Sequence, residues 1–224
     1  MLSANPSYSS SSYSTERESE GVIAVGQAQS RVKRLFDFAT AILVILLILS
    51  WLTPLVALAI WLTSPGPVLF IQLRTGRYGQ PFRCFKFRTM TYNPAAAFKQ
   101  ATKNDTRVTR IGHFLRRTNL DEMPQFVNVL LGDMTVVGPR PHAVQMDAHY
   151  WHTLHGYPDR YRVRPGITGL AQVRGCRGET DTVQKMKHRL RLDHFYIQKQ
   201  SIRLDVRICW WTVIRVIKGD EKAH

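Results

Sequence analysis

The chain has 224 residues, 44% of them hydrophobic, and carries 31 Lys and Arg against 16 Asp and Glu, a formal charge of +15. This length accommodates one domain with its own core. The positive charge favours anionic partners: nucleic acid, anionic lipid headgroups or phosphorylated substrates. The three cysteines are far apart and form no metal-ligand pair. We therefore expect free thiols and a globular part in the reducing cytoplasm.

Residues 1–30 are rich in serine and include SYSSSSYSTERESE. Such a segment buries too little apolar surface to offset its ordering entropy, so we predict a disordered tail. No apolar stretch follows the start of the chain, which argues against a signal peptide.

An uncharged apolar run extends from about residue 38 to 62 and is long enough to cross a bilayer. Pro54 breaks it, and hydroxyls such as Thr53 can bond the carbonyls that a proline frees. Basic residues flank both ends, and the positive-inside rule cannot keep both flanks in the cytoplasm if the segment crosses. Residues 31–63 are therefore predicted to form a re-entrant hairpin kinked at Thr53 and Pro54, with a plain span as the alternative. Asp37, at its entry, should pair with Arg34 or with a basic residue of the globular part.

Residues 64–224 are predicted to form the globular domain. VLFIQLR and PFRCFKFRTM alternate apolar with polar residues around GRYGQP, which predicts a strand hairpin with a basic face. Residues 107–131 have helical spacing, with Thr118 and Asn119 as candidate N-caps near Asp121. Residues 142–162 are also expected to be helical, RPGITGLAQVRG to be loop and strand, and residues 183–217 to be one helix. Its basic residues and tryptophans suit the membrane interface, with core packing as the alternative.

Two sets of side chains could carry chemistry. In the adjacent pair Asp121 and Glu122, one carboxylate can attack phosphorus and the other can bind Mg²⁺. Arginine and lysine side chains in strands and Gly/Pro turns can hold phosphate oxygens; they are Lys86, Arg88, Arg140, Arg174 and Arg177. The histidines lack zinc-site spacing, so we treat them as surface or core residues.

The segments KRLFDF, the proline-broken run, SPGPVLFIQLRTG, PFRCFKFRTM, LRRTNLDEMPQFVNVLLGDMTVVGPRP and YRVRPGITGLAQVRG occur in that order. Together they resemble the bacterial sugar transferases, the monotopic phosphoglycosyl transferases that move a hexose-1-phosphate onto a polyprenyl phosphate. The resemblance covers about residues 31–218. The C-terminal part is more similar to members that transfer glucose-1-phosphate, and galactose-1-phosphate stays open.

The resemblance implies a small α/β (α+β) monotopic membrane protein with a re-entrant helix and interfacial amphipathic helices. It implies that Asp121 is the nucleophile, that Glu122 binds Mg²⁺, and that UMP leaves before undecaprenyl phosphate accepts the phospho-sugar. Further residues are expected to bind the UDP-sugar and its phosphates: Lys86, Arg88, Arg140, Gln172, Arg177 and Asp193. Expected partners are the UDP-sugar, the polyprenyl phosphate and membrane lipids, with no nucleic acid.

We place the protein at the bacterial inner membrane, with the catalytic domain on the cytoplasmic face. A membrane-anchored nucleic-acid-binding protein is the alternative, because it explains the charge and the apolar run. It does not explain a carboxylate pair beside phosphate-binding arginines. An inactive scaffold with the same fold is disfavoured by the intact carboxylate pair and the intact Pro-Arg-Pro turn.

Overall fold

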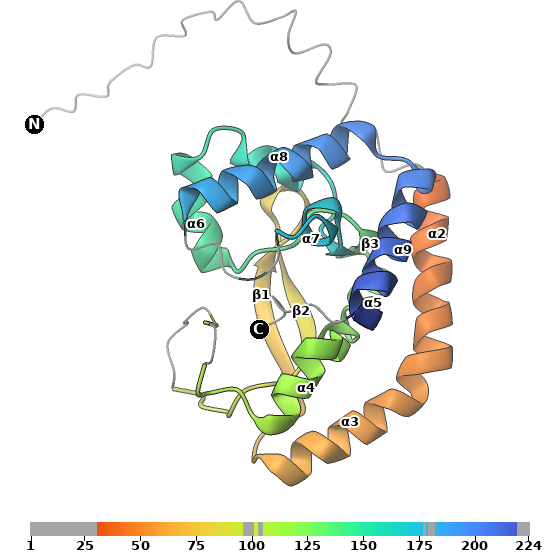
Figure 1. Ribbon diagram of the computed structural model, residues 1–224, viewed down its shortest axis with the longest axis vertical. Coiled ribbons are helices and arrows are strands. Elements are labelled where there is room, and N and C mark those ends of the chain that lie inside the picture. The colour runs from red at the N-terminus through yellow and green to blue at the C-terminus, as the bar shows by residue number, and fades with distance from the viewer. Residues whose placement is uncertain (1–30, 96–100, 103–104, 177, 179–181, 219–224) are drawn as a thin grey trace, which may run out of the picture.

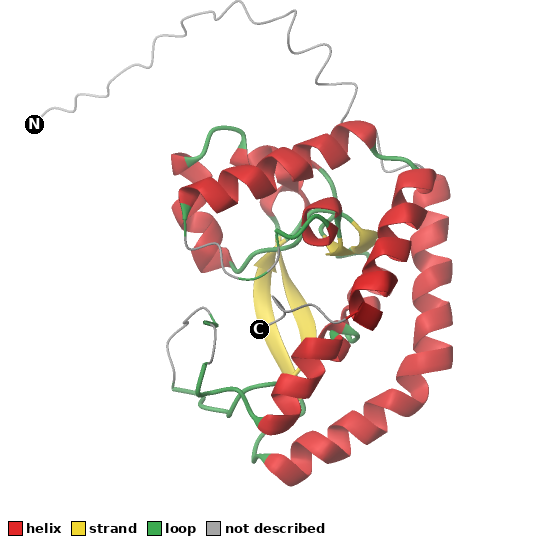
Figure 2. Ribbon diagram, viewed as in Figure 1, coloured by secondary structure: helices red, strands yellow, loops and turns green. Residues whose placement is uncertain are grey.

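A computed structural model describes residues 31–95, 101–102, 105–176, 178 and 182–218; the predicted disordered tail lies outside them. The described part of the chain contains both helices and short strands (Figure 1, Figure 2), which agrees with the predicted mixed fold. The helices are α2 (Arg31–Val44), α3 (Ser50–Thr63), α4 (Arg110–Thr118), α5 (Gln125–Leu131), α6 (Val144–Thr153), α7 (Leu170–Val173), α8 (Val183–Lys199) and α9 (Ile202–Lys218). The strands are β1 (Leu69–Thr75), β2 (Pro81–Phe87), β3 (Thr135–Val137) and β4 (Gly166–Thr168).

The strands form two small sheets. β1 and β2 make the predicted antiparallel hairpin, with Leu69 opposite Phe87 and Thr75 opposite Pro81. Its turn contains Tyr78 and Gly79, both with positive φ, and a 3₁₀ helix spans Arg77–Gly79. β3 and β4 pair in parallel, although they are only three residues each. A glycine follows each of these short strands, Gly138 after β3 and Gly169 after β4.

The apolar run forms one bent helical segment from Arg31 to Thr63, long and apolar enough to cross a membrane. α2 and α3 run in different directions (Figure 1), joined by a π-helical stretch, Ile45–Leu49. Pro54 lies inside α3 and cannot donate to the carbonyl of Ser50, which disturbs the ladder one turn upstream. The Ser50 amide bonds the Ile45 carbonyl, and its hydroxyl bonds the Leu46 carbonyl at 2.7 Å. The bend therefore lies just before the predicted proline kink.

Buried charges join α2 to the rest of the protein. Lys33 Nζ lies 2.8 Å from Asp205 Oδ2 of α9 and 3.8 Å from Asp37 Oδ1. Asp37 also accepts the Thr135 hydroxyl at 2.6 Å and the Val136 amide at 3.0 Å. Its basic neighbour is thus Lys33, whereas Arg34 donates to the carbonyls of Val129 and Leu130 in α5. These contacts fix α2 against β3 and α9.

Two helical predictions need correction. The predicted helix over 183–217 is two helices, since Gln200, with ψ 125°, leaves the helical conformation and Ser201 starts α9 by accepting the Leu204 amide with its hydroxyl. α9 buries Ile208 but exposes 63% of Trp210 and 78% of Ile217, so it both packs on the core and presents an apolar face. The predicted helix over 142–162 is also divided, because Gly156 has φ 73° and separates α6 from a 3₁₀ helix, Tyr157–Arg162.

We predict that Asp37→Asn lowers the free energy of unfolding by about 3–5 kcal/mol. The buried ammonium of Lys33 then loses one of its two carboxylate partners. Asp159→Asn is the matched control, since Asp159 pairs with Arg162 at the surface and exposed pairs contribute about 1 kcal/mol or less. Thermal unfolding in detergent measures both. Equal losses of stability in the two variants would show that the buried cluster contributes no more than a surface ion pair.

Candidate active site

Asp121 and Glu122 lie on a 3₁₀ helix, Leu120–Glu122, between α4 and α5. Asn119 ends α4 in the left-handed conformation, with φ 60°, which asparagine tolerates better than most residues. Asn119 occupies the predicted N-cap position of this 3₁₀ helix, although its side chain makes no cap hydrogen bond there. Thr118 is not a cap, because its hydroxyl bonds back to the Phe114 carbonyl. The reversal at Asn119 turns both carboxylates inward, and each is less than a tenth exposed.

Glu122 is paired with two basic side chains from other elements. Lys86 of β2 donates to its Oε1 at 2.7 Å. Arg140, in the turn after β3, donates from Nη1 to Oε2 at 2.9 Å and from Nη2 to Oε1. The forked guanidinium contact is of the bidentate kind that makes arginine–carboxylate pairs strong. The structure thus brings together three predicted site residues that lie 36 and 18 positions apart in the sequence.

Asp121 lies beside this cluster without being bound by it. Within the described parts of the chain, burial and neighbouring charges set the environment of its carboxylate, and no side-chain hydrogen bond is among the main contributions to its pKa. Burial raises the pKa of Asp121 to about 6; the charge of Glu122 adds to that rise, while Lys86 and Arg116 oppose it. The carboxylate is therefore mostly ionised at neutral pH, as a carboxylate nucleophile must be.

Arg88 was expected to bind phosphate, but the structure directs it elsewhere. Its Nη1 donates to the Pro65 carbonyl at 2.8 Å and its Nη2 to the Ser64 carbonyl at 2.7 Å. The side chain therefore ties the end of α3 to the end of β2. In this arrangement Arg88 holds the apolar segment onto the hairpin, and Lys86 is the residue of KFR that reaches Glu122.

Two further expected substrate residues, Gln172 and Asp193, lie near the Gly138–Pro141 turn. Gln172 of α7 donates to the Ile167 carbonyl at 3.1 Å. Asp193 of α8 pairs with Arg160 at 2.9 Å instead of facing the carboxylates. Arg177 lies outside the described residues. Arg174 lies over the ring of Trp211, 5.0 Å from its centroid.

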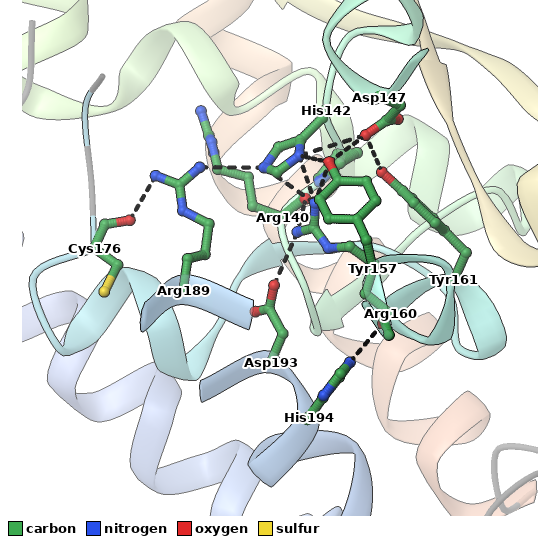
Figure 3. A network of polar contacts seen from close by, with 12 residues as sticks. Arg140, His142, Asp147, Tyr157, Arg160, Tyr161, Cys176, Arg189, Asp193 and His194 are labelled. Carbon is green, nitrogen blue, oxygen red and sulfur yellow. Dashed lines mark hydrogen bonds and ion pairs between the residues drawn. The ribbon is translucent and has the colours of Figure 1, made fainter. Parts of the chain in front are cut away.

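A buried polar network behind Arg140 was missed by sequence reasoning (Figure 3). Its members come from the turn after β3, α6, the 3₁₀ helix and α8: His142, Asp147, Tyr157, Arg160, Tyr161, Arg189 and Asp193. Asp147 accepts the hydroxyls of Tyr157 and Tyr161. Burial raises the pKa of its carboxyl, but hydrogen bonds with His142, Thr75 and Tyr157 outweigh burial and lower that pKa to about 2. One signal was available, because YPDRYR, at the end of the predicted helix over 142–162, holds two tyrosines and two arginines close together.

The side chains of the described site could supply only part of the ligand shell of a Mg²⁺ ion. No cluster of three or more metal-binding side chains occurs in the described part of the chain. Asp121 and Glu122 supply two adjacent carboxylates, and Mg²⁺ is commonly held by one or two carboxylates together with substrate phosphates. Glu122 would hold the ion, with the remaining ligands coming from phosphate and water.

The family profile "Bacterial sugar transferase" matches residues 28–219. The chain belongs to this family. It is 48% identical over 190 residues to the UDP-glucose:undecaprenyl-phosphate glucose-1-phosphate transferase of Escherichia coli K12, which covers 83% of this chain and 41% of that protein. It is 46% identical to the exopolysaccharide production protein PSS of Rhizobium leguminosarum bv. phaseoli, covering 82% and 94%. It is 34% identical to the UDP-galactose-lipid carrier transferase of Erwinia amylovora, covering 84% and 41%.

These coverages show which part of the relatives the chain matches. It spans less than half of the Escherichia coli and Erwinia amylovora proteins, yet nearly the whole Rhizobium protein. The matched region contains the apolar helix, the carboxylate pair and the Pro-Arg-Pro turn.

We predict that Asp121→Asn stabilises the fold in a pH-dependent manner. The raised pKa means that wild type loses stability as pH rises from about 4, where the unfolded Asp ionises, to about 6, where the folded Asp ionises. The advantage of the Asn variant should therefore grow over that window and be constant above it. Thermal unfolding between pH 4 and 8 measures this difference. An advantage that does not vary with pH would contradict the raised pKa.

Proposed function

We propose that the protein transfers glucose-1-phosphate from UDP-glucose to undecaprenyl phosphate and releases UMP, as the first membrane step of an exopolysaccharide-type glycan synthesis. The observation that carries the proposal is the carboxylate pair, in which Glu122 is held by two cations while its neighbour Asp121 is buried and has a raised pKa. The similarity to enzymes with this named activity supports it. A nucleic-acid-binding protein would have no use for this arrangement.

In the proposed reaction, an Asp121 oxygen attacks the phosphorus that bears the sugar, and the bond to UMP breaks. The resulting aspartyl phospho-sugar is attacked by a phosphate oxygen of undecaprenyl phosphate, which restores the carboxylate and forms the lipid diphosphate sugar. Lys86 and Arg140 lie where they can neutralise phosphate charge during both steps. A Mg²⁺ ion held by Glu122 would supply further positive charge.

The comparisons favour glucose as the sugar. Identity is 48% to the glucose-1-phosphate transferase and 34% to the UDP-galactose-lipid carrier transferase, over similar shares of the chain. We therefore propose UDP-glucose as the donor ahead of UDP-galactose.

The proposed location is the cytoplasmic membrane, with α2 and α3 in the lipid and both of their ends on the cytoplasmic side. Large apolar side chains are exposed along this segment, among them Leu47, Trp51, Leu55, Trp61 and Leu62. Exposed apolar surface of this extent indicates contact with lipid or protein. The bend before Pro54 and the contact of Arg88 with Ser64 support a segment that returns toward the globular part.

We predict that enzyme mixed with UDP-glucose and Mg²⁺, without lipid, releases UMP and carries a hexose phosphate on Asp121. Mass spectrometry of the intact protein and its peptides detects this adduct. Asp121→Asn should remain folded and lose both signals, whereas Asp159→Asn, with its carboxylate at the surface, should keep both. UMP release that strictly requires lipid, without an adduct, would exclude the covalent route and leave direct transfer.

We also predict that cysteines placed at Arg31 and Pro67 are both labelled from the cytoplasmic side only. The three native cysteines are first replaced by serine, and a membrane-impermeant maleimide is applied to intact spheroplasts and to inside-out vesicles. Labelling of the two positions from opposite sides would establish a plain span instead of a re-entrant segment.

A further inference from the structure

We propose that Arg160 is a positioning residue for this reaction: it holds the backbone of the Gly138–Pro141 turn so that the Arg140 guanidinium faces Glu122. The inference rests on the proposed function for its consequence, but its structural part does not depend on turnover. It also gives Asp193 a different role from the expected one, as the anchor of Arg160 instead of a substrate ligand.

Arg160 joins two elements through one nitrogen. Its Nη2 donates to the Arg140 carbonyl at 2.8 Å and to Asp193 Oδ2 of α8 at 2.9 Å. Figure 3 shows Arg160 lying between the Arg140 backbone and α8. Arg140 thus has both of its ends engaged, since its side chain reaches Glu122 and its carbonyl accepts from Arg160.

The turn depends on such outside donors because of its composition. Pro139 and Pro141 have no amide hydrogens, so the turn has few donors of its own. Each of its last three carbonyls accepts a bond from another segment: Pro139 from the Gly166 amide, Arg140 from Arg160, and Pro141 from Arg74 Nη1 at 2.6 Å. Of these three donors, Arg160 bonds the residue that contacts Glu122.

The position of Arg160 is itself closely determined. It is 1% exposed, and its guanidinium carbon lies 5.3 Å and 5.4 Å from the ring centroids of Tyr157 and Tyr161. Its Nη1 lies against the His142 ring and 3.3 Å from the Tyr157 hydroxyl. Burial and the charge of Arg160 keep the pKa of His142 well below its usual value, so a neutral imidazole lies between two guanidinium groups. A buried cation with this many partners has one favoured orientation.

Arg160→Lys tests the inference, because one ammonium group cannot keep the Nη2 contacts with the Arg140 carbonyl and Asp193 together with the Nη1 contacts at His142 and Tyr157. Arg189→Lys is the matched control. Arg189 is buried in the same network and contacts the same His142 ring, but its other nitrogen donates to the carbonyls of Cys176 and Gly178 and not to the turn. Asp193→Asn is a milder second variant, since it keeps the size of the side chain and weakens only the anchor of Arg160.

Two measurements are made on the full-length protein in detergent: kcat/KM for UMP release from UDP-glucose, and hydrogen–deuterium exchange of the peptide that contains residues 137–143. We expect Arg160→Lys to lower kcat/KM by about 10- to 100-fold, the effect of a misplaced substrate-binding group, and to speed exchange in the turn. Asp193→Asn should do the same more weakly, and the double variant should be less than additive because the two residues act as one unit. Arg189→Lys should change kcat/KM by less than about threefold and leave the turn protected.

Equal losses in Arg160→Lys and Arg189→Lys would overturn the inference, because a general structural role affects both. Unchanged exchange in the turn would also overturn it, whatever the rate. If Arg160→Lys does not fold, Asp193→Asn decides between the same outcomes. If wild type releases no UMP, the proposed function fails, while the exchange measurement still shows whether Arg160 holds the turn.

Discussion

The interaction on which the structure most depends is the buried contact of Lys33 with Asp37 and Asp205. Burying three charges carries a large desolvation cost, which is offset only when each charge is paired and hydrogen-bonded. The cluster meets that condition, because Asp37 accepts hydrogen bonds from Thr135 and Val136, and Asp205 accepts one from Tyr196. Lys33 and Tyr196 both donate to the Val137 carbonyl, at the end of β3. The start of the turn that carries Arg140 is therefore fixed by the same residues that hold the apolar helix.

The adjacent carboxylates of Asp121 and Glu122 lie in different environments. Glu122 meets cations from β2 and from the turn, whereas Asp121 is buried beside them with its pKa raised to about 6. Different environments for two neighbouring acids are a common basis for different roles in catalysis. The reversal at Asn119 places both side chains on a short 3₁₀ helix, where each is buried next to the basic residues of β2 and of the turn.

The sequence predicted the parts that depend on local signals. The hairpin, the helices around residue 121 and the apolar segment follow from alternation, turn residues and hydrophobicity, whereas Lys86, Arg140 and Glu122 were assigned to one site by the family resemblance. It did not predict where long side chains go when several acceptors are available. Arg88 bonds Ser64 and Pro65, and Asp193 pairs with a residue 33 positions away. Such pairings are decided by tertiary packing. The break between α8 and α9 was missed because the apolar periodicity continues through Ser201.

The cations of the site are already engaged before any substrate is present. Lys86 and Arg140 neutralise Glu122, so a diphosphate must compete with that carboxylate for them. This competition has a use, since two long side chains are held near the reacting position with little freedom left to lose, which lowers the entropic cost of binding. It also gives a physical reason for a divalent cation in the proposed reaction: only if Glu122 finds another positive partner can both basic side chains turn to phosphate without leaving a buried carboxylate unpaired. Because the Arg140 backbone is held by Arg160, this change of partner requires movement of the side chain alone.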